Sequence, residues 1–184
     1  ISVAIGWELY NQTSSALVLG GVGLAQILPI ILLFLPAGYI IDRYNRKYIM
    51  IVAQIVLVLA SLALAALSYR HGPLFLIYAS LVAIGSAQAF SSPTSSTLVA
   101  QVIPEQAYEN AMTWRSSVAQ LSAVLGPAIG GFLIGIFHDA TLVFVVNAFA
   151  ATLFVVLLFF MHVRPQKAPA FQQRTLSSLV DGLR

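Results

Sequence analysis

The chain has 184 residues, of which 59% are hydrophobic and only 8% are charged. This composition excludes an ordinary soluble domain, in which about a quarter of the residues are charged, and it excludes intrinsic disorder. The chain has no cysteine, so disulfides, thiolate metal sites and cysteine nucleophiles are excluded as well. We therefore expect an all-α integral membrane protein.

Intervals without Asp, Glu, Lys or Arg mark the expected membrane-spanning helices, because about 20 apolar residues cross a ~30 Å hydrocarbon core. We place complete spans near residues 20–41, 48–69, 74–98, 116–137 and 141–161. Residues 1–10 are apolar except for Glu8 and are too short to cross, so we expect them to be the end of a truncated first span. Together, residues 1–163 form one transmembrane bundle. We expect the chain to be a fragment without a signal peptide.

The distribution of Lys and Arg predicts the orientation, because these residues collect in cytoplasmic loops. With spans on alternating sides, only Arg70 falls on the face opposite to the other Lys and Arg residues. We therefore expect residues 42–47 and 164–184 to be cytoplasmic, with the spans in the inner membrane of a bacterium. The net charge of +3 reflects this topology, and no clustered basic stripe suggests nucleic-acid binding.

Beyond residue 163 the composition becomes polar and proline-bearing, as in a linker. Within it, we expect a short amphipathic helix over residues 175–184, because four apolar residues recur there at helical spacing. This helix lies on the membrane or on the protein, although an ordinary surface helix fits the pattern equally well.

The connection between the second and third spans carries the most specific motif, GYIIDRYNRK. It resembles the loop signature of the major facilitator superfamily, which joins the second and third helices of those transporters. The matching residues are Gly38, Asp42, Arg43, Arg46 and Lys47. Asn45 stands where the family has glycine, and we expect it to adopt a left-handed conformation, which Asn tolerates well. The alternative is a loop that is basic only because it is cytoplasmic.

The resemblance gives this loop a role as a conformational switch. Gly38 is expected to let a neighbouring helix backbone approach closely. The resemblance implies that Asp42 contacts the other half of the transporter and stabilises one conformer.

The fifth span carries small residues at four-residue spacing, which predict a close contact with another helix. The segment is also similar to the antiporter motif of exporters in the superfamily. The residues concerned are Ser122, Gly126, Pro127, Gly130 and Gly131. The alternative is a generic tight helix contact.

The resemblance implies the N-terminal six-helix half of a major facilitator superfamily transporter, built as two inverted three-helix repeats. Its partners are then the C-terminal six-helix half, the lipid bilayer and a small-molecule substrate. Spans 1 and 4 would line the cavity, spans 2 and 5 would contact the other half, and spans 3 and 6 would face lipid. Ala148 in span 6 is accordingly expected to face lipid.

Two polar residues within spans are candidates for proton coupling or substrate contact. Glu8 is the only carboxylate in an apolar span, and ionisable residues inside the membrane are candidates for function. It either faces a cavity and carries a proton or extends into external water. Gln88 is the second candidate, in span 4. No pattern predicts a metal, a cofactor or a catalytic set of an enzyme.

We expect one half of a secondary active transporter that works by alternating access. Spans 2, 4 and 5 look most like the bacterial branch that exports drugs and siderophores and includes the enterobactin exporter, so an ion-gradient-driven exporter is the first hypothesis. An importer of the same superfamily and a non-transporting membrane scaffold are the alternatives.

Overall fold

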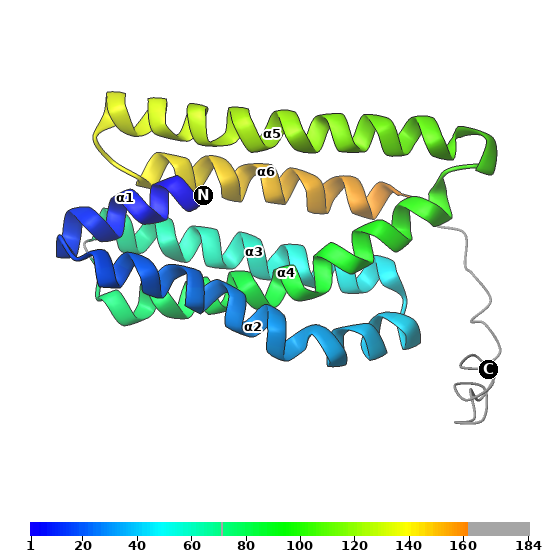
Figure 1. Cartoon of the computed structure of the whole chain (residues 1–184), viewed down its shortest axis with the longest axis horizontal. Helices are drawn as coiled ribbons and strands as arrows, with labels where there is room; N and C mark the ends of the chain where they lie inside the picture. The colour runs from blue at the N-terminus through cyan, green and yellow to red at the C-terminus, as the bar shows by residue number, and fades with distance from the viewer. Residues whose placement is uncertain (71, 162–184) are drawn as a thin grey trace, which may run out of the picture.

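The computed structural model describes residues 1–70 and 72–161, which form an all-helical bundle with short connections (Figure 1). Its helices are α1 Ser2–Thr13, α2 Ala16–Arg43, α3 Arg46–Tyr69, α4 Leu74–Val102, α5 Tyr108–Phe137 and α6 Thr141–Phe160, with a 3₁₀ turn η1 at Glu105–Ala107. The linker and the amphipathic helix expected over residues 164–184 lie outside the described residues.

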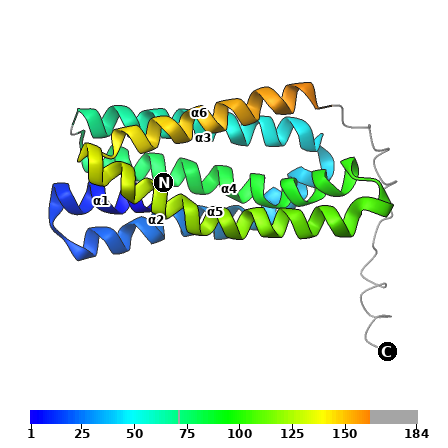
Figure 2. The same ribbon diagram turned by 90° about the horizontal axis from the view of Figure 1, so that it is seen from above.

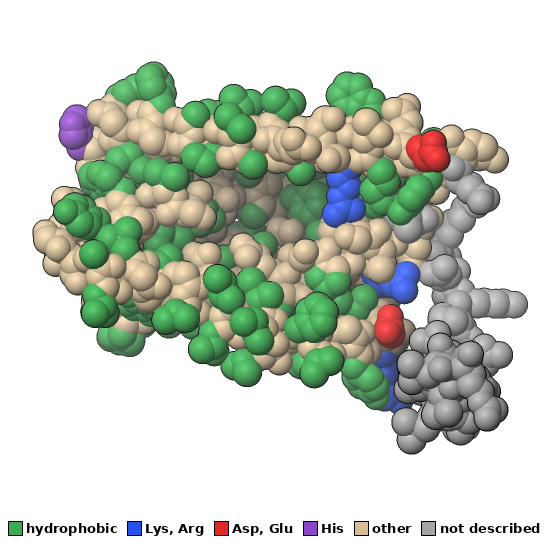
Figure 3. Space-filling model, in the orientation of Figure 1, with side chains coloured by type: hydrophobic (Ala, Val, Ile, Leu, Met, Phe, Trp, Pro, Cys, Tyr) green, Lys and Arg blue, Asp and Glu red, His purple; other side chains and the backbone are tan. Residues whose placement is uncertain are grey.

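Five of these helices, α2 to α6, are long and apolar enough to cross a membrane. α1 has 12 residues, or about 18 Å of helix, which is less than the ~30 Å hydrocarbon core. Figure 3 shows hydrophobic side chains along the length of the bundle and Lys, Arg and acidic side chains toward one end. The chain is therefore a multi-pass membrane protein.

α5 is longer than the span expected from the sequence. It begins at Tyr108 rather than near residue 116, and so includes Glu109 and Arg115. A charge-free interval marks only the apolar part of a helix. Because the backbone hydrogen bonds of a helix are internal, the helix can continue past the membrane boundary.

The helices pack unevenly. α3 packs along α6 on one side and α4 on the other, and α4 packs in turn along α2 (Figures 1 and 2). α1 covers one end of this group, where Ile5, Leu9 and Leu81 are fully buried. α5 contributes only Gly130 and Ile134 to the buried residues of the described chain.

The packing of α6 overturns one expectation. Ala148 was expected to face lipid, but only 3% of its surface is exposed because α6 lies along α3. Its neighbour Asn147 donates a hydrogen bond from Nδ2 to Oγ of Ser61 on α3, at 2.8 Å. The face of α6 that carries these two residues is thus an interior face.

α2 and α4 approach each other closely. A Cβ built on Gly85 of α4 would collide with the backbone oxygen of Gln26 and lie 3.1 Å from its Cα. Nearby, the Tyr78 hydroxyl donates to the backbone oxygen of Val18 at 2.7 Å, crossing over Gly21. The two backbones come this close because Gly85 has no side chain at the crossing point, and Gly21 leaves room for the ring of Tyr78.

Candidate functional site

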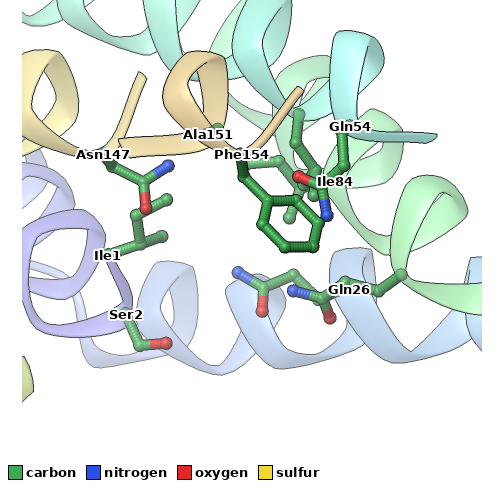
Figure 4. Close-up of a pocket in the computed structure, with 10 residues that line it drawn as sticks. Ile1, Ser2, Gln26, Gln54, Ile84, Asn147, Ala151 and Phe154 are labelled. Carbon is green, nitrogen blue, oxygen red and sulfur yellow. The ribbon is translucent and has the colours of Figure 1, made fainter. Parts of the chain in front are cut away.

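A pocket of about 490 Å³, lined by both apolar and amide side chains, lies between α1, α2, α3, α4 and α6. Its lining residues are Ile1, Ser2, Gln26, Gln54, Leu57, Ile84, Gln88, Asn147, Ala151 and Phe154. We call it the amide pocket, because four helices each contribute one carboxamide to it. Figure 4 shows Gln26, Gln54 and Asn147 around Phe154 in this space.

The carboxamides lie at middle depth in the bundle. Gln88 stands near the centre of the 29-residue α4, and Gln26 lies in the middle part of the 28-residue α2. Among the described residues, no charged side chain lines the pocket. Because a carboxamide both donates and accepts hydrogen bonds, the pocket suits uncharged polar groups that also need apolar contact.

The sequence predicted only Gln88 of these four residues. Gln54 and Asn147 were missed because spans 3 and 6 were expected to face lipid. The signal that identifies them is a lone amide in a long apolar run, as in the segment MIVAQIVLVLA around Gln54. Such an amide is costly in lipid, so it points toward the interior or a cavity.

Glu8 does not extend into external water, since only 6% of its surface is exposed. Its Oε1 accepts a hydrogen bond from Nε2 of Gln12 at 2.7 Å. Its Oε2 accepts one from Oγ of Ser68, at the end of α3, at 2.8 Å. The carboxylate is thus held between α1 and α3, and it makes no ion pair within the described residues.

A second carboxylate meets the same serine. Oγ of Ser68 lies 3.4 Å from Oδ1 of Asp139, in the turn between α5 and α6. This oxygen also accepts from the backbone N–H and the hydroxyl of Thr141, at 2.9 and 2.8 Å. Burial by itself raises the pKa of Asp139, but the donors on Thr141, Ser68 and Ala140 outweigh it and lower the pKa from 3.8. We call Gln12, Glu8, Ser68, Asp139 and Thr141 the carboxylate network.

The aspartate of the motif between α2 and α3 lies on the surface of the described bundle. Asp42 is exposed, and its carboxylate makes no hydrogen bond or ion pair within residues 1–70 and 72–161. Arg43 instead donates to the hydroxyl of Tyr39, with its guanidinium 5.5 Å from the centre of that ring. Around Gly38, no described atom lies within 4 Å of the position of a Cβ. The aspartate and the glycine are thus open to a partner.

Asn45 differs from the sequence expectation. Its φ is −65°, so it is not left-handed, and that prediction is wrong. The residue is the N-cap of α3, and its side-chain oxygen accepts a hydrogen bond from the backbone N–H of Lys47 at 3.0 Å. Asn is among the best N-cap residues, which is why the chain can start a helix there without glycine.

The basic residues of the motif lie at the start of α3. Arg46 is the first residue of that helix. Nζ of Lys47 donates to the backbone oxygens of Phe159 and Met161, at 3.0 and 2.8 Å, and so binds the end of α6. A cation at this position satisfies carbonyls that lack intrahelical partners and interacts favourably with the helix dipole.

The motif of α5 faces outward from the described bundle. Ser122, Gly126, Pro127 and Gly131 are exposed, and only Gly130 is buried. A Cβ on Gly130 would lie 4.0 Å from Cγ1 of Val143, which is ordinary contact. None of the described helices therefore approaches this stretch backbone to backbone, and Figure 3 shows the hollow beneath α5.

Comparisons with known proteins agree with this architecture. Residues 1–183 match the Major Facilitator Superfamily. The chain is 26% identical to the staphyloferrin A transporter of Staphylococcus aureus, over 91% of this chain and 42% of the relative. It is 31% identical to an uncharacterized MFS-type transporter of Bacillus subtilis, over 85% of this chain and 37% of the relative.

A third relative is macrolide efflux protein A of Streptococcus pyogenes, which is 25% identical over 75% of this chain and 34% of the relative. The chain thus spans less than half the length of these three relatives. No solved structure matches the chain significantly. Since the family match covers nearly all of its residues, the chain belongs to the major facilitator superfamily.

Proposed function

We propose that this chain is the N-terminal half of a secondary active transporter that exports small molecules, such as drugs or siderophores, by alternating access. The amide pocket is the observation that carries the proposal, because it gathers uncharged polar groups from four helices at middle depth in an apolar bundle. Substrate sites of secondary transporters lie near the bilayer midplane. The names of two relatives, macrolide efflux protein A and the staphyloferrin A transporter, support a small-molecule substrate.

The partner in this proposal is a second six-helix half of the same protein. The exposed small residues of α5 and the open surface around Gly38 support a partner on these faces, because small residues let helix backbones approach. Asp42 has no partner in the described chain and is free to contact that half in one conformer. The position of Arg43 and Lys47 supports a cytoplasmic side for this loop in a bacterial inner membrane.

The proposal also concerns the short helix α1. Its first residues, Ile1 and Ser2, line the amide pocket, and its 12 residues are too few to cross the membrane. The N-terminal end of α1 therefore forms one wall of the amide pocket.

Counterflow of labelled compounds in proteoliposomes of the full-length protein tests the transport activity. We expect Gln88→Leu and Gln54→Leu to reduce counterflow of the accepted compounds at least tenfold. Ser86→Ala is the matched control, because its hydroxyl bonds only to Val82 of its own helix and lies outside the amide pocket. Full activity in both glutamine variants would exclude the pocket as the substrate path, and no counterflow with any compound would favour a scaffold.

Flux measured with imposed gradients then separates exporter from importer. We expect accumulation on the external side when a proton gradient is imposed, without added ATP. Accumulation on the opposite side would favour an importer.

The proposed role of the motif loop has its own test. Asp42→Asn keeps the size of the side chain but removes the charge that would bind the other half. We expect normal abundance in the membrane and a large loss of transport. Glu109→Gln is the matched control, because it neutralises another exposed carboxylate, in the first turn of α5 and outside the motif. Wild-type rates for Asp42→Asn at equal abundance would refute the role.

A further inference from the structure

Two walls of the amide pocket are held in place by contacts behind them. On the wall made by α3 and α6, Nδ2 of Asn147 donates a hydrogen bond to Oγ of Ser61, which is fully buried. On the wall made by α2 and α4, the backbone of Gln26 lies against Gly85, one turn before Gln88. The positions of these carboxamides are thus set by the helix packing, before any ligand enters.

The contact with Ser61 decides which way the carboxamide of Asn147 faces. Because the serine takes Nδ2, the oxygen Oδ1 lies on the other side of the group, and Figure 4 shows it on the side of Ile1, which lines the pocket. This oxygen accepts no hydrogen bond from any described residue. Asn147 therefore presents a fixed acceptor to whatever occupies the pocket.

The three glutamines of the pocket make no such fixed demand. The side chains of Gln26, Gln54 and Gln88 form no hydrogen bond within the described residues. A carboxamide without a fixed partner can turn either its oxygen or its nitrogen toward a ligand. Asn147 is therefore the residue that discriminates between ligands, and it favours one that donates a hydrogen bond.

The rest of the lining disfavours a charge and offers an aromatic ring. No Asp, Glu, Lys or Arg of the described chain lines the pocket, and burying a charge without a partner is costly. The ring of Phe154 stands among the carboxamides, and Ile84 and Leu57 add apolar surface. An aromatic ring of a ligand can pack against Phe154 in an offset or edge-on arrangement. The lining thus suits an uncharged aromatic group.

We propose that the amide pocket binds an uncharged aromatic group that carries an N–H or O–H donor, and that Asn147, oriented by Ser61, selects this donor. This rests on the proposed function and names the chemical class of its substrate as neutral aromatic amides and phenols rather than carboxylates or ammonium ions. The donor points at Oδ1 of Asn147 and the ring lies against Phe154. Ser61 is a positioning residue, because it contacts Asn147 and not the ligand.

The test measures binding as the rise in unfolding midpoint of the full-length protein in detergent, over a concentration series of each probe. The probes are benzamide, N,N-dimethylbenzamide, which keeps the ring and the carbonyl but has no N–H, and benzoate, which is charged. We expect the apparent affinity for benzamide to be about tenfold higher than for either of the others, because those two leave Oδ1 of Asn147 unpaired.

Two variants test the assignment to Asn147 and Ser61. Asn147→Leu removes the acceptor, so the preference for benzamide over N,N-dimethylbenzamide should fall to about threefold or less. Ser61→Ala leaves Nδ2 without its partner, so the carboxamide can turn and the preference should fall as well. A substitution that only loosens the bundle would weaken both probes by the same factor and leave their ratio unchanged.

Ser80→Ala is the matched control, because it removes another buried serine hydroxyl, which bonds to Leu76 of its own helix and lies outside the amide pocket. It should keep the wild-type preference. Equal affinities of the wild type for the three probes, no binding of benzamide, or an unchanged preference in Asn147→Leu would overturn the inference.

Inhibition of counterflow by the same probes separates this inference from the proposed function. If the wild type shows no counterflow with any compound, the proposed function fails, while the binding series in detergent still decides on the selection by Asn147. If counterflow occurs and benzamide inhibits it no better than N,N-dimethylbenzamide, the proposed function stands and the inference is wrong.

Discussion

The contact between α2 and α4 and the outer face of α5 both carry glycine, yet they differ in what the glycine does. Gly85 brings α4 against the backbone of Gln26, where no larger residue fits. On α5, no described atom lies within 4 Å of a Cβ on Gly126 or Gly131. The comparison teaches that small residues at helical spacing mark a face that can be approached closely. Only the neighbouring element decides whether that approach occurs.

The largest effect is expected from Gly85→Ala, because the new methyl group would collide with a backbone oxygen that belongs to another helix. Overpacking of this kind costs about 1–3 kcal/mol. The loss is measured as a lower midpoint of thermal unfolding of the full-length protein in detergent. Gly126→Ala is the control on α5 and is expected to cause no loss from contacts within this half. Equal loss in both variants would contradict the comparison.

The second prediction compares leucine substitutions at two buried positions, an alanine on α6 and a glycine on α5. Ala148→Leu adds three carbons at a position that is 3% exposed between α6 and α3. Gly130→Leu adds more volume, but its first neighbour is the movable end of Val143, 4.0 Å away. We expect the larger drop in unfolding midpoint for Ala148→Leu. The reverse order would mean that α5 is held more closely than its described contacts indicate.

A third, smaller effect is expected at the end of the bundle where α3 begins and α6 ends. Lys47→Met removes two hydrogen bonds to the last carbonyls of α6 while it keeps the apolar part of the side chain. The expected loss is about 1 kcal/mol, as for other charges at helix ends. Arg43→Met is the control, because in the described chain the side chain of Arg43 contacts Tyr39 of its own helix and does not reach α6. A loss in the control as large as in Lys47→Met would assign the effect to net charge.

The smallest effect concerns the turn that joins α5 to α6. Because the pKa of Asp139 is lowered in the folded state, its contribution to stability is complete above pH 3.8 and is lost as the pH falls through the lowered value. Asp139→Asn should remove this part of the acid sensitivity. Unfolding midpoints of the two proteins, compared between neutral and acidic pH, check the sign. A steeper acid loss in the variant would contradict it.

The sequence was sufficient for the features that lipid imposes. A bilayer of fixed thickness and low polarity forces long charge-free helices, so α2 to α6 were recognisable from the intervals between charges. The loop motif likewise identified the family. The observed helix bounds differ from the predicted ones where a helix continues past the apolar layer, as α5 does at Tyr108.

Contacts between distant residues were not accessible in this way. Glu8 is held by Ser68, sixty positions away, and the sequence offered only a choice between a cavity and water. Asn45 was assigned a left-handed turn because the family has glycine there, whereas a side-chain cap meets the same need. Gln54 and Asn147 became visible as a site only when the pairing of α3 with α6 turned them toward one pocket.

The length of α5 sets how this chain meets bilayers of different thickness. Its 30 residues correspond to about 45 Å of helix, whereas the 20 residues of α6 correspond to about 30 Å and match the hydrocarbon core. The excess lies in the first turns of α5, which carry Glu109, exposed Trp114 and Arg115, whose Nη2 donates to Ser95 of α4 at 3.3 Å. We therefore expect these turns to stand in the headgroup layer. In a thicker membrane α5 is still long enough to cross the hydrocarbon core. α6 is then too short, so the hydrophobic mismatch is expected at α6.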